Sequence, residues 1–185
     1  MAKASGSTRL IKRIPVSTKT LYGIFSTLLS TGEYDVEKSY VNSKTGAFYL
    51  QSKGREPDDN ERTAAKSFVD RGISITITPE GDLRYATAFK PDGTPKFSDG
   101  LATVYTYEQK TIEKTAEKII SNYKHGIQHA VDKGAKIAFI FDRYGKGHRE
   151  QVEQAMREYQ LPKWGKMPER VIVMNKNGDF FEHHF

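Results

Sequence analysis

The sequence contains no cysteine among its 185 residues. Scaffolds held by disulfides, zinc sites built on thiolates and cysteine nucleophiles are therefore excluded. No apolar run approaches the ~18 residues that a membrane-spanning helix needs. The first six residues, MAKASG, lack the apolar core of a secretory signal. These absences favour a soluble, cytoplasmic domain without a membrane partner.

Basic residues are in modest excess. Lys and Arg number 29 against 23 Asp and Glu, which gives a formal net charge of +6. Hydrophobic residues make up 37% of the chain and aromatic residues 11%, which is enough for a packed core. The length suits one compact domain. Six surplus charges spread over such a surface permit a polyanionic partner such as nucleic acid without identifying one.

The chain is expected to have two parts. Residues 1–35 are predicted to form a basic N-terminal extension with a short helix over 18–29, where apolar residues recur at helical spacing. Residues 36–185 are predicted to form the main domain, which begins with a hairpin over 36–50. A polar loop, KGREPDDN over 53–60, follows the hairpin.

The main domain is predicted to alternate strands and helices. Helices are expected over 61–71, 112–131 and 147–159, and strands over 73–77, 83–89, 102–110, 136–141, 170–174 and 180–185. The apolar run KIAFIF over 136–141 predicts a strand buried on both faces. The strand, helix and strand over 136–174 predict two parallel neighbours with a right-handed crossover. The expected class is therefore α/β, with a small central mixed sheet flanked by helices.

Candidate chemistry lies in the segment over 97–110. Glu108 and Lys110 are two positions apart on a predicted strand, so their side chains share one face about 6–7 Å apart. Asp99 precedes Glu108 by nine positions and can approach it if the two segments form a hairpin. Two carboxylates and an ammonium group suit a hard divalent cation and an activated water. The alternative is a solvated strand face, since Glu-x-Lys is a common sequence.

Glu61 opens the helix predicted over 61–71. Apolar residues lie three, four and seven positions after it, which places Glu61 on the inward face of the first helical turn. A carboxylate there either interacts with the positive end of the helix dipole or belongs to a buried polar site. The sequence leaves both interpretations open.

These motifs, taken in order, resemble the PD-(D/E)xK nuclease superfamily, and in particular the branch that includes tRNase domains of contact-dependent-inhibition toxins and related mobile-element proteins. The resemblance covers 36–185, about four-fifths of the chain, and it rests on the order and spacing of ExxAAxxFxxxG from Glu61, an Ile-rich strand, Pro79-Glu80, an acidic residue and Glu108-x-Lys110. It implies a restriction-endonuclease-like fold and a metal-dependent nuclease acting on RNA, tRNA above all, or on DNA. It also implies Mg²⁺ or Mn²⁺ held by Asp99, Glu108 and Glu61, with Lys110 completing the catalytic set, and an inhibitor or immunity protein as a partner.

One position departs from the family pattern. The family has proline before the aspartate, whereas Ser98 stands before Asp99. Asp92 does follow a proline, seven residues earlier, and is the alternative ligand. The nine-residue step to Glu108 and the flanking Gly100 favour Asp99. The missing proline also suits a second function, a nucleic-acid-binding or accessory module that keeps the fold without the activity.

Further candidates are nucleic-acid contacts. Gln128 lies on the long helix, where members of the family often carry a polar residue near the site. The loop over 143–149 follows the KIAFIF strand at the end where α/β folds place ligand loops, and it offers Arg143, Lys146, His148 and Arg149 to phosphates. The alternatives are a polar helix flank and a solvated loop. His125 and His129 have a spacing able to chelate zinc, with a plain surface pair as the favoured interpretation.

Overall fold

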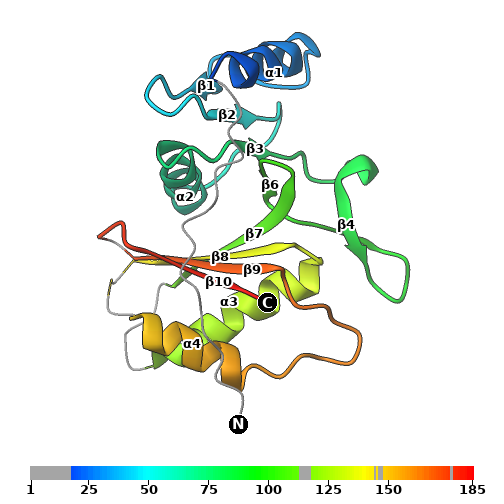
Figure 1. Ribbon diagram of the computed structural model, residues 1–185. Helices are drawn as coiled ribbons and strands as arrows, with labels where there is room; N and C mark the ends of the chain where they lie inside the picture. Colours follow the sequence, from blue (N-terminus) through cyan, green and yellow to red (C-terminus); the bar gives the residue numbers. More distant parts are fainter. Residues whose placement is uncertain (1–17, 113–117, 144, 146–147, 176) are drawn as a thin grey trace.

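An eight-stranded mixed sheet forms the centre of the protein, in the order β1-β2-β3-β6-β7-β8-β9-β10 (Figure 1). The computed structural model describes residues 18–112, 118–143, 145, 148–175 and 177–185. The sheet strands are β1 (Tyr40–Val41), β2 (Phe48–Gln51), β3 (Ile75–Ile77), β6 (Gly100–Ala102), β7 (Tyr105–Ile112), β8 (Ile137–Asp142), β9 (Arg170–Asn175) and β10 (Phe180–His184). The helices are α1 (Thr18–Ser30), α2 (Asp59–Asp70), α3 (Ile119–Lys133) and α4 (Arg149–Glu158).

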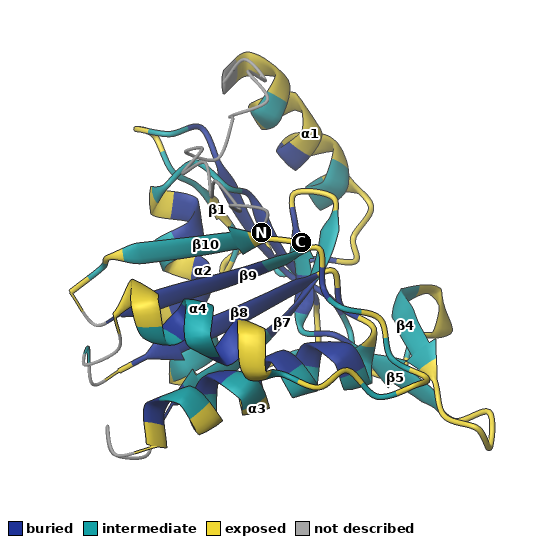
Figure 2. Cartoon of the chain, turned by 60° about the horizontal axis from the view of Figure 1, so that its bottom comes forward, coloured by how far each residue is buried: buried dark blue, intermediate teal, exposed yellow. Residues whose placement is uncertain are grey.

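Helices cover both faces of the sheet. Figure 1 shows α2 on one side of β8 and β9 and α3 with α4 on the other. The side chains of β8 alternate between two apolar clusters, with Phe139 against α2 and Ile140 against α3. Every residue of β8 is buried (Figure 2). The expected α/β class with a mixed central sheet is therefore confirmed, although the sheet is larger than expected.

The parallel part of the sheet follows the predicted crossover. β7 pairs with β8, and β8 with β9, in parallel registers, with α3 and α4 as the connections. β10 then returns antiparallel to β9 through a turn at Gly178, whose φ of 82° suits glycine. At the other edge, β1 pairs with β2 as the predicted hairpin.

Helix α2 starts and stops as its sequence predicts. The Asp58 side chain accepts a hydrogen bond from the Glu61 backbone N–H, and the Glu61 side chain accepts one from the Asp58 backbone N–H. This reciprocal capping box satisfies two backbone donors of the first turn. Gly72 follows the helix at a φ of 85°.

Helix α1 confirms the short helix predicted near the N-terminus. Phe25 of α1 packs in a third apolar cluster with Tyr34, Phe48 and Leu50, so the helix is anchored on β2. Residues 1–17 lie outside the described residues, and the division into 1–35 and 36–185 stays a prediction. None of the described helices is long and apolar enough to cross a membrane.

Three predicted elements were wrong in detail. The segment over 83–89 does not pair with β3; it forms a 3-10 turn (Leu83–Tyr85) and then β4 (Ala86–Phe89), which pairs with β5 (Pro95–Phe97) in a separate hairpin that stands away from the sheet (Figure 2). The strand expected over 102–110 is two antiparallel strands, β6 and β7. The long helix begins at Ile119, and β7 continues to Ile112.

The residues between β6 and β7 do not have the sequence pattern of a turn. Thr103 adopts a φ of 60°, which β-branched residues rarely do, so the sequence carries no glycine or asparagine signal there. Tertiary contacts enforce the turn: the Thr103 backbone N–H donates to the Ser74 carbonyl at 2.7 Å. This hydrogen bond thus overrides the local conformational preference of Thr103.

We predict that Gly126→Ala destabilises the protein. A Cβ at Gly126 would lie 2.7 Å from Cγ1 of Ile140, which is fully buried, so α3 would have to move off β8. Overpacking of this kind lowers the free energy of unfolding by about 1–3 kcal/mol. Urea denaturation measures the change, and Gly23→Ala on α1, where a Cβ meets nothing within 4 Å, is the control. The control should be neutral or stabilising; equal effects would contradict the packing argument.

Candidate functional site

The hairpin of β6 and β7 brings Asp99 beside Glu108. Asp99 immediately precedes β6, whose first residue, Gly100, pairs with Tyr107, the neighbour of Glu108 in β7. The Asp99 backbone N–H donates to the Tyr107 carbonyl at 3.1 Å, and its carboxylate accepts the Gln109 backbone N–H at 2.7 Å. Asp92 instead lies in the turn between β4 and β5, where its carboxylate accepts from the Thr94 backbone. The structure therefore brings Asp99, and not Asp92, to Glu108.

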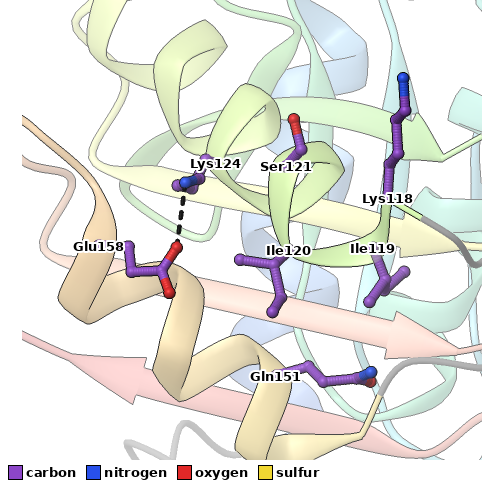
Figure 3. Close-up of a pocket in the computed structure, with 7 residues that line it drawn as sticks. All are labelled: Lys118, Ile119, Ile120, Ser121, Lys124, Gln151 and Glu158. Carbon is purple, nitrogen blue, oxygen red and sulfur yellow. Dashed lines mark hydrogen bonds and ion pairs between the residues drawn. The ribbon is translucent and has the colours of Figure 1, made fainter.

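A cleft of about 190 Å³ lies next to this pair. It joins the start of α2 to the end of β7, and it is lined by Asp58, Asn60, Glu61, Asp99, Gln109, Lys110 and Thr111. Three of the residues singled out from the sequence therefore share one concave surface. The larger hollow, of about 450 Å³ between α3 and α4, is lined by Lys118, Ile119, Ile120, Ser121, Lys124, Gln151 and Glu158 and contains none of them (Figure 3).

Glu108 is buried, and its carboxyl group is not fully hydrogen-bonded within the described residues. Its residue is only 6% exposed, and Oε2 has no hydrogen-bond partner among the described residues. Its Oε1 lies 3.9 Å from Nδ1 of His129 on α3. Burial, together with the negative charge of Asp99, raises the pKa of Glu108 to about 8 against the opposing charge of Lys133. A carboxyl in this state lacks a compensating cation.

Asp99 also has a pKa above its ordinary value. Burial raises the pKa of Asp99 to about 6, and the hydrogen bond from the Gln109 backbone opposes the rise. Asp99 lies on the α2 side, near Arg55, whereas Glu108 faces α3. The two carboxyls thus approach the open end of the β6/β7 hairpin from the two faces of the sheet.

Arg55 is one of the residues near the site that the sequence did not single out. Its guanidinium lies 2.7 Å from Glu61, 3.2 Å from Glu80 and 3.7 Å from Asp99, and its side chain is only 15% exposed. The sequence assigned Arg55 to a polar linking loop, and no spacing rule connects a loop residue to carboxylates on three other segments. The ion pairs show that the protein supplies a cation of its own to Glu61 and Asp99.

Glu61 therefore has structural partners for both oxygens. One accepts from Arg55 and the other from the Asp58 backbone in the capping box. Among the described residues, no group of three or more histidine, aspartate or glutamate side chains is arranged to hold a metal ion. Mg²⁺ binds through one or two carboxylates and completes its shell with waters and phosphate oxygens, so a cation held by Asp99 and Glu108 stays a prediction. The Oε2 atom of Glu108, which has no partner among the described residues, is the observation that favours it. A metal-binding role for Glu61 stays a prediction.

Two lysines lie near the carboxyl pair. Lys110 follows Glu108 by two positions on β7, lines the cleft and forms no ion pair within the described part of the chain. Lys133, which the sequence did not single out, comes from α3 and donates to the Phe97 carbonyl at 3.0 Å. Its charge opposes the raised pKa values of both carboxyls. Lys110 is thus a lysine of the cleft lining that has no ion-pair partner among the described residues.

The predicted nucleic-acid contacts are only partly near this site. Gln128 donates to Asp132 and accepts from Tyr159, so it joins α3 to α4 and does not contact the carboxyl pair. Arg143 is exposed just beyond β8, whose last residue pairs with Ile112, two positions past Lys110. Of the remaining three candidates, His148 is the N-cap residue of α4, and Arg149 in α4 forms an ion pair with Glu153. Lys146 lies outside the described residues.

We predict that the apoprotein loses stability as the pH rises, and that Glu108→Gln reduces the loss. A carboxyl whose pKa is raised in the folded state stabilises that state below its ordinary pKa, and the contribution disappears as the pH passes the folded value of about 8. The variant should therefore melt at least about 2 °C above wild type at pH 9, which corresponds to ~1 kcal/mol. The two should converge near pH 4.5.

Melting temperatures between pH 4.5 and 9 in the presence of a chelator give the measurement. Glu37→Gln, which removes an exposed carboxylate near β1, is the matched control and should follow wild type. A Glu108→Gln profile that also parallels wild type would show that Glu108 titrates as an ordinary carboxyl.

Comparison with known proteins gives one structural likeness. No protein-family model matches the sequence, and no curated protein matches it. The chain is similar to a chain of the CdiA-CT/CdiI toxin and immunity complex from Burkholderia pseudomallei, with 15% sequence identity and a TM-score of 0.48. The match covers 74% of this chain and 98% of that chain. At this level of similarity the likeness carries no argument about activity, so the function has to be argued from the site itself.

Proposed function

We propose that the protein is a metal-dependent phosphodiesterase of the PD-(D/E)xK type, a nuclease that hydrolyses RNA or DNA. The observation that supports this proposal best is the half-buried Asp99 beside the buried Glu108, whose Oε2 has no partner among the described residues, with Lys110 in the lining of the adjoining cleft. Two carboxyls with raised pKa values gain stability when a divalent cation arrives. The sequence resemblance makes tRNA the favoured substrate and an inhibitor or immunity protein the favoured partner.

Asp99 and Glu108 are the proposed holders of the Mg²⁺ or Mn²⁺ ion. When bound, such an ion polarises a phosphate oxygen and lowers the pKa of a coordinated water. The chain's own contribution is orientation: the Gln109 backbone N–H fixes the Asp99 carboxylate, and the walls of the sheet exclude water from Glu108. Rigid placement of this kind supplies much of the advantage of an enzyme over free solution.

Lys110 is the proposed third catalytic group. It lines the cleft from β7, and its ammonium group would hold a phosphate oxygen as negative charge accumulates during attack. The excess of basic residues and the exposed Arg143 at the end of β8 would hold the neighbouring backbone phosphates. Glu61 is placed in the supporting role, since it fixes Arg55 against Asp99.

The second candidate is an accessory module that binds nucleic acid without cutting it. The position of Arg55 favours it, because a guanidinium between Glu61 and Asp99 provides permanently part of the charge that a metal ion would otherwise supply. Metal binding separates the two candidates.

We predict that Mn²⁺ raises the melting temperature of the wild-type protein and that Asp99→Asn and Glu108→Gln each remove the rise. Stabilisation by a ligand grows with its concentration over Kd and reaches about 2.7 kcal/mol at a hundredfold excess. Asp92→Asn is the matched control and should keep the wild-type shift, because Asp92 lies in the β4/β5 turn. No shift in the wild-type protein would favour the accessory module.

We also predict that Lys110→Ala lowers the rate of phosphodiester cleavage by at least about 100-fold, as loss of a group that stabilises developing charge does. Fluorescently labelled tRNA, single-stranded RNA and duplex DNA serve as substrates, with Mn²⁺ present. Lys44→Ala, in the exposed turn between β1 and β2, is the control and should cleave like wild type. Unchanged cleavage by a folded Lys110→Ala protein would place the catalytic site elsewhere.

A further inference from the structure

Two histidines on α3 form a close pair outside the cleft. His125 and His129 are one helical turn apart, and their Nε2 atoms lie 3.2 Å from each other with the rings nearly perpendicular. His125 is exposed and His129 is 35% exposed, so solvent reaches the pair. We propose that this pair is a second metal site, selective for a borderline transition metal such as Zn²⁺, Ni²⁺ or Cu²⁺.

The distance between the two nitrogens fits a shared ion. In a tetrahedral site with metal–nitrogen bonds of about 2.0–2.1 Å, two imidazole nitrogens lie ~3.3 Å apart. The observed 3.2 Å therefore requires almost no movement of either ring. Imidazole ligands select Zn²⁺, Ni²⁺ and Cu²⁺ over the hard cations Mg²⁺ and Mn²⁺. Waters would complete the shell on the exposed side.

The helix that carries the pair is held in place. Ile127 and Ala130, on the opposite side of α3, are fully buried, and Gly126 allows the helix to approach Ile140 of β8. The spacing of the two histidines is thus fixed by the fold, which lowers the entropy cost of forming a chelate.

Glu108 supplies the independent observation. Metal-binding histidines commonly have a carboxylate behind the ring, next to the nitrogen that does not bind the ion. When His129 binds through Nε2, its Nδ1 carries the proton, and Oε1 of Glu108 lies 3.9 Å from that nitrogen. The other oxygen of this carboxyl, Oε2, is buried and has no hydrogen-bond partner among the described residues. Asp132 also favours a cation near His129, whereas Lys110 and Lys133 oppose it.

Zn²⁺ titration of the untagged full chain by isothermal calorimetry tests the proposal. Wild type should bind one Zn²⁺ at the pair, and His125→Gln and His129→Gln should each weaken that binding by at least about tenfold. His184→Gln is the matched control, because His184 is also exposed and lies 3.1 Å from a carboxylate, that of Glu182. It should leave the binding at the pair unchanged. Wild-type affinity in either pair variant would overturn the proposal.

Two further measurements separate metal binding at the histidine pair from effects of the substitutions on folding and from binding at the proposed nuclease site. The electron paramagnetic resonance spectrum of wild type with one equivalent of Cu²⁺ should show coupling to two nitrogens, and a spectrum without it would overturn the assignment. Asp99→Asn should retain Zn²⁺ binding, and His125→Gln should retain the Mn²⁺ response of wild type. Loss of Zn²⁺ binding in Asp99→Asn would mean that the ion binds at the carboxyl pair instead.

Discussion

The close approach of Gly100 to the Thr76 carbonyl is the constraint on which the site depends. A Cβ at Gly100 would collide with that oxygen and contact the Tyr107 ring, so only glycine lets β6 fit between β3 and β7. This insertion sets the register of the β6/β7 hairpin, in which Gly100 pairs with Tyr107, and so brings Asp99 and Glu108, the neighbours of that pair, close together. The position of the carboxyl pair therefore depends on the absence of a side chain at Gly100.

The charges around the hairpin are arranged on its two sides. On the α2 side, Arg55 neutralises Glu61 and Asp99, whereas on the α3 side Glu108 lies near His129 and interacts favourably with the charge of Lys133. Burial is costly for a charge that lacks a partner. Glu108 bears this cost of burying a charge. Buried carboxyls of this kind occur at sites where a ligand supplies the missing charge.

Most of the secondary structure was predictable because its signals are local. The alternation of β8 and β9 between two apolar clusters follows from continuous apolar runs, and the start of α2 follows from the Asp58 and Glu61 capping box. The failures have one cause. The turn at Thr103 and the pairing of β4 with β5 are set by contacts with segments distant in sequence, and local propensity carries no record of such contacts.

For the site, the sequence by itself determined which groups are present and that Glu108 and Lys110 share a strand face, because alternation along a strand is a local rule. The tertiary structure decided their partners. It brought Asp99 rather than Asp92 to Glu108, placed Arg55 between Glu61 and Asp99, and set His129 behind Glu108. These pairings join residues that are 6 to 44 positions apart in the chain. The step from Asp99 to Glu108 had a spacing signal in the sequence, whereas the contacts of Arg55 and His129 are fixed by packing of the sheet against its helices, which no spacing rule describes.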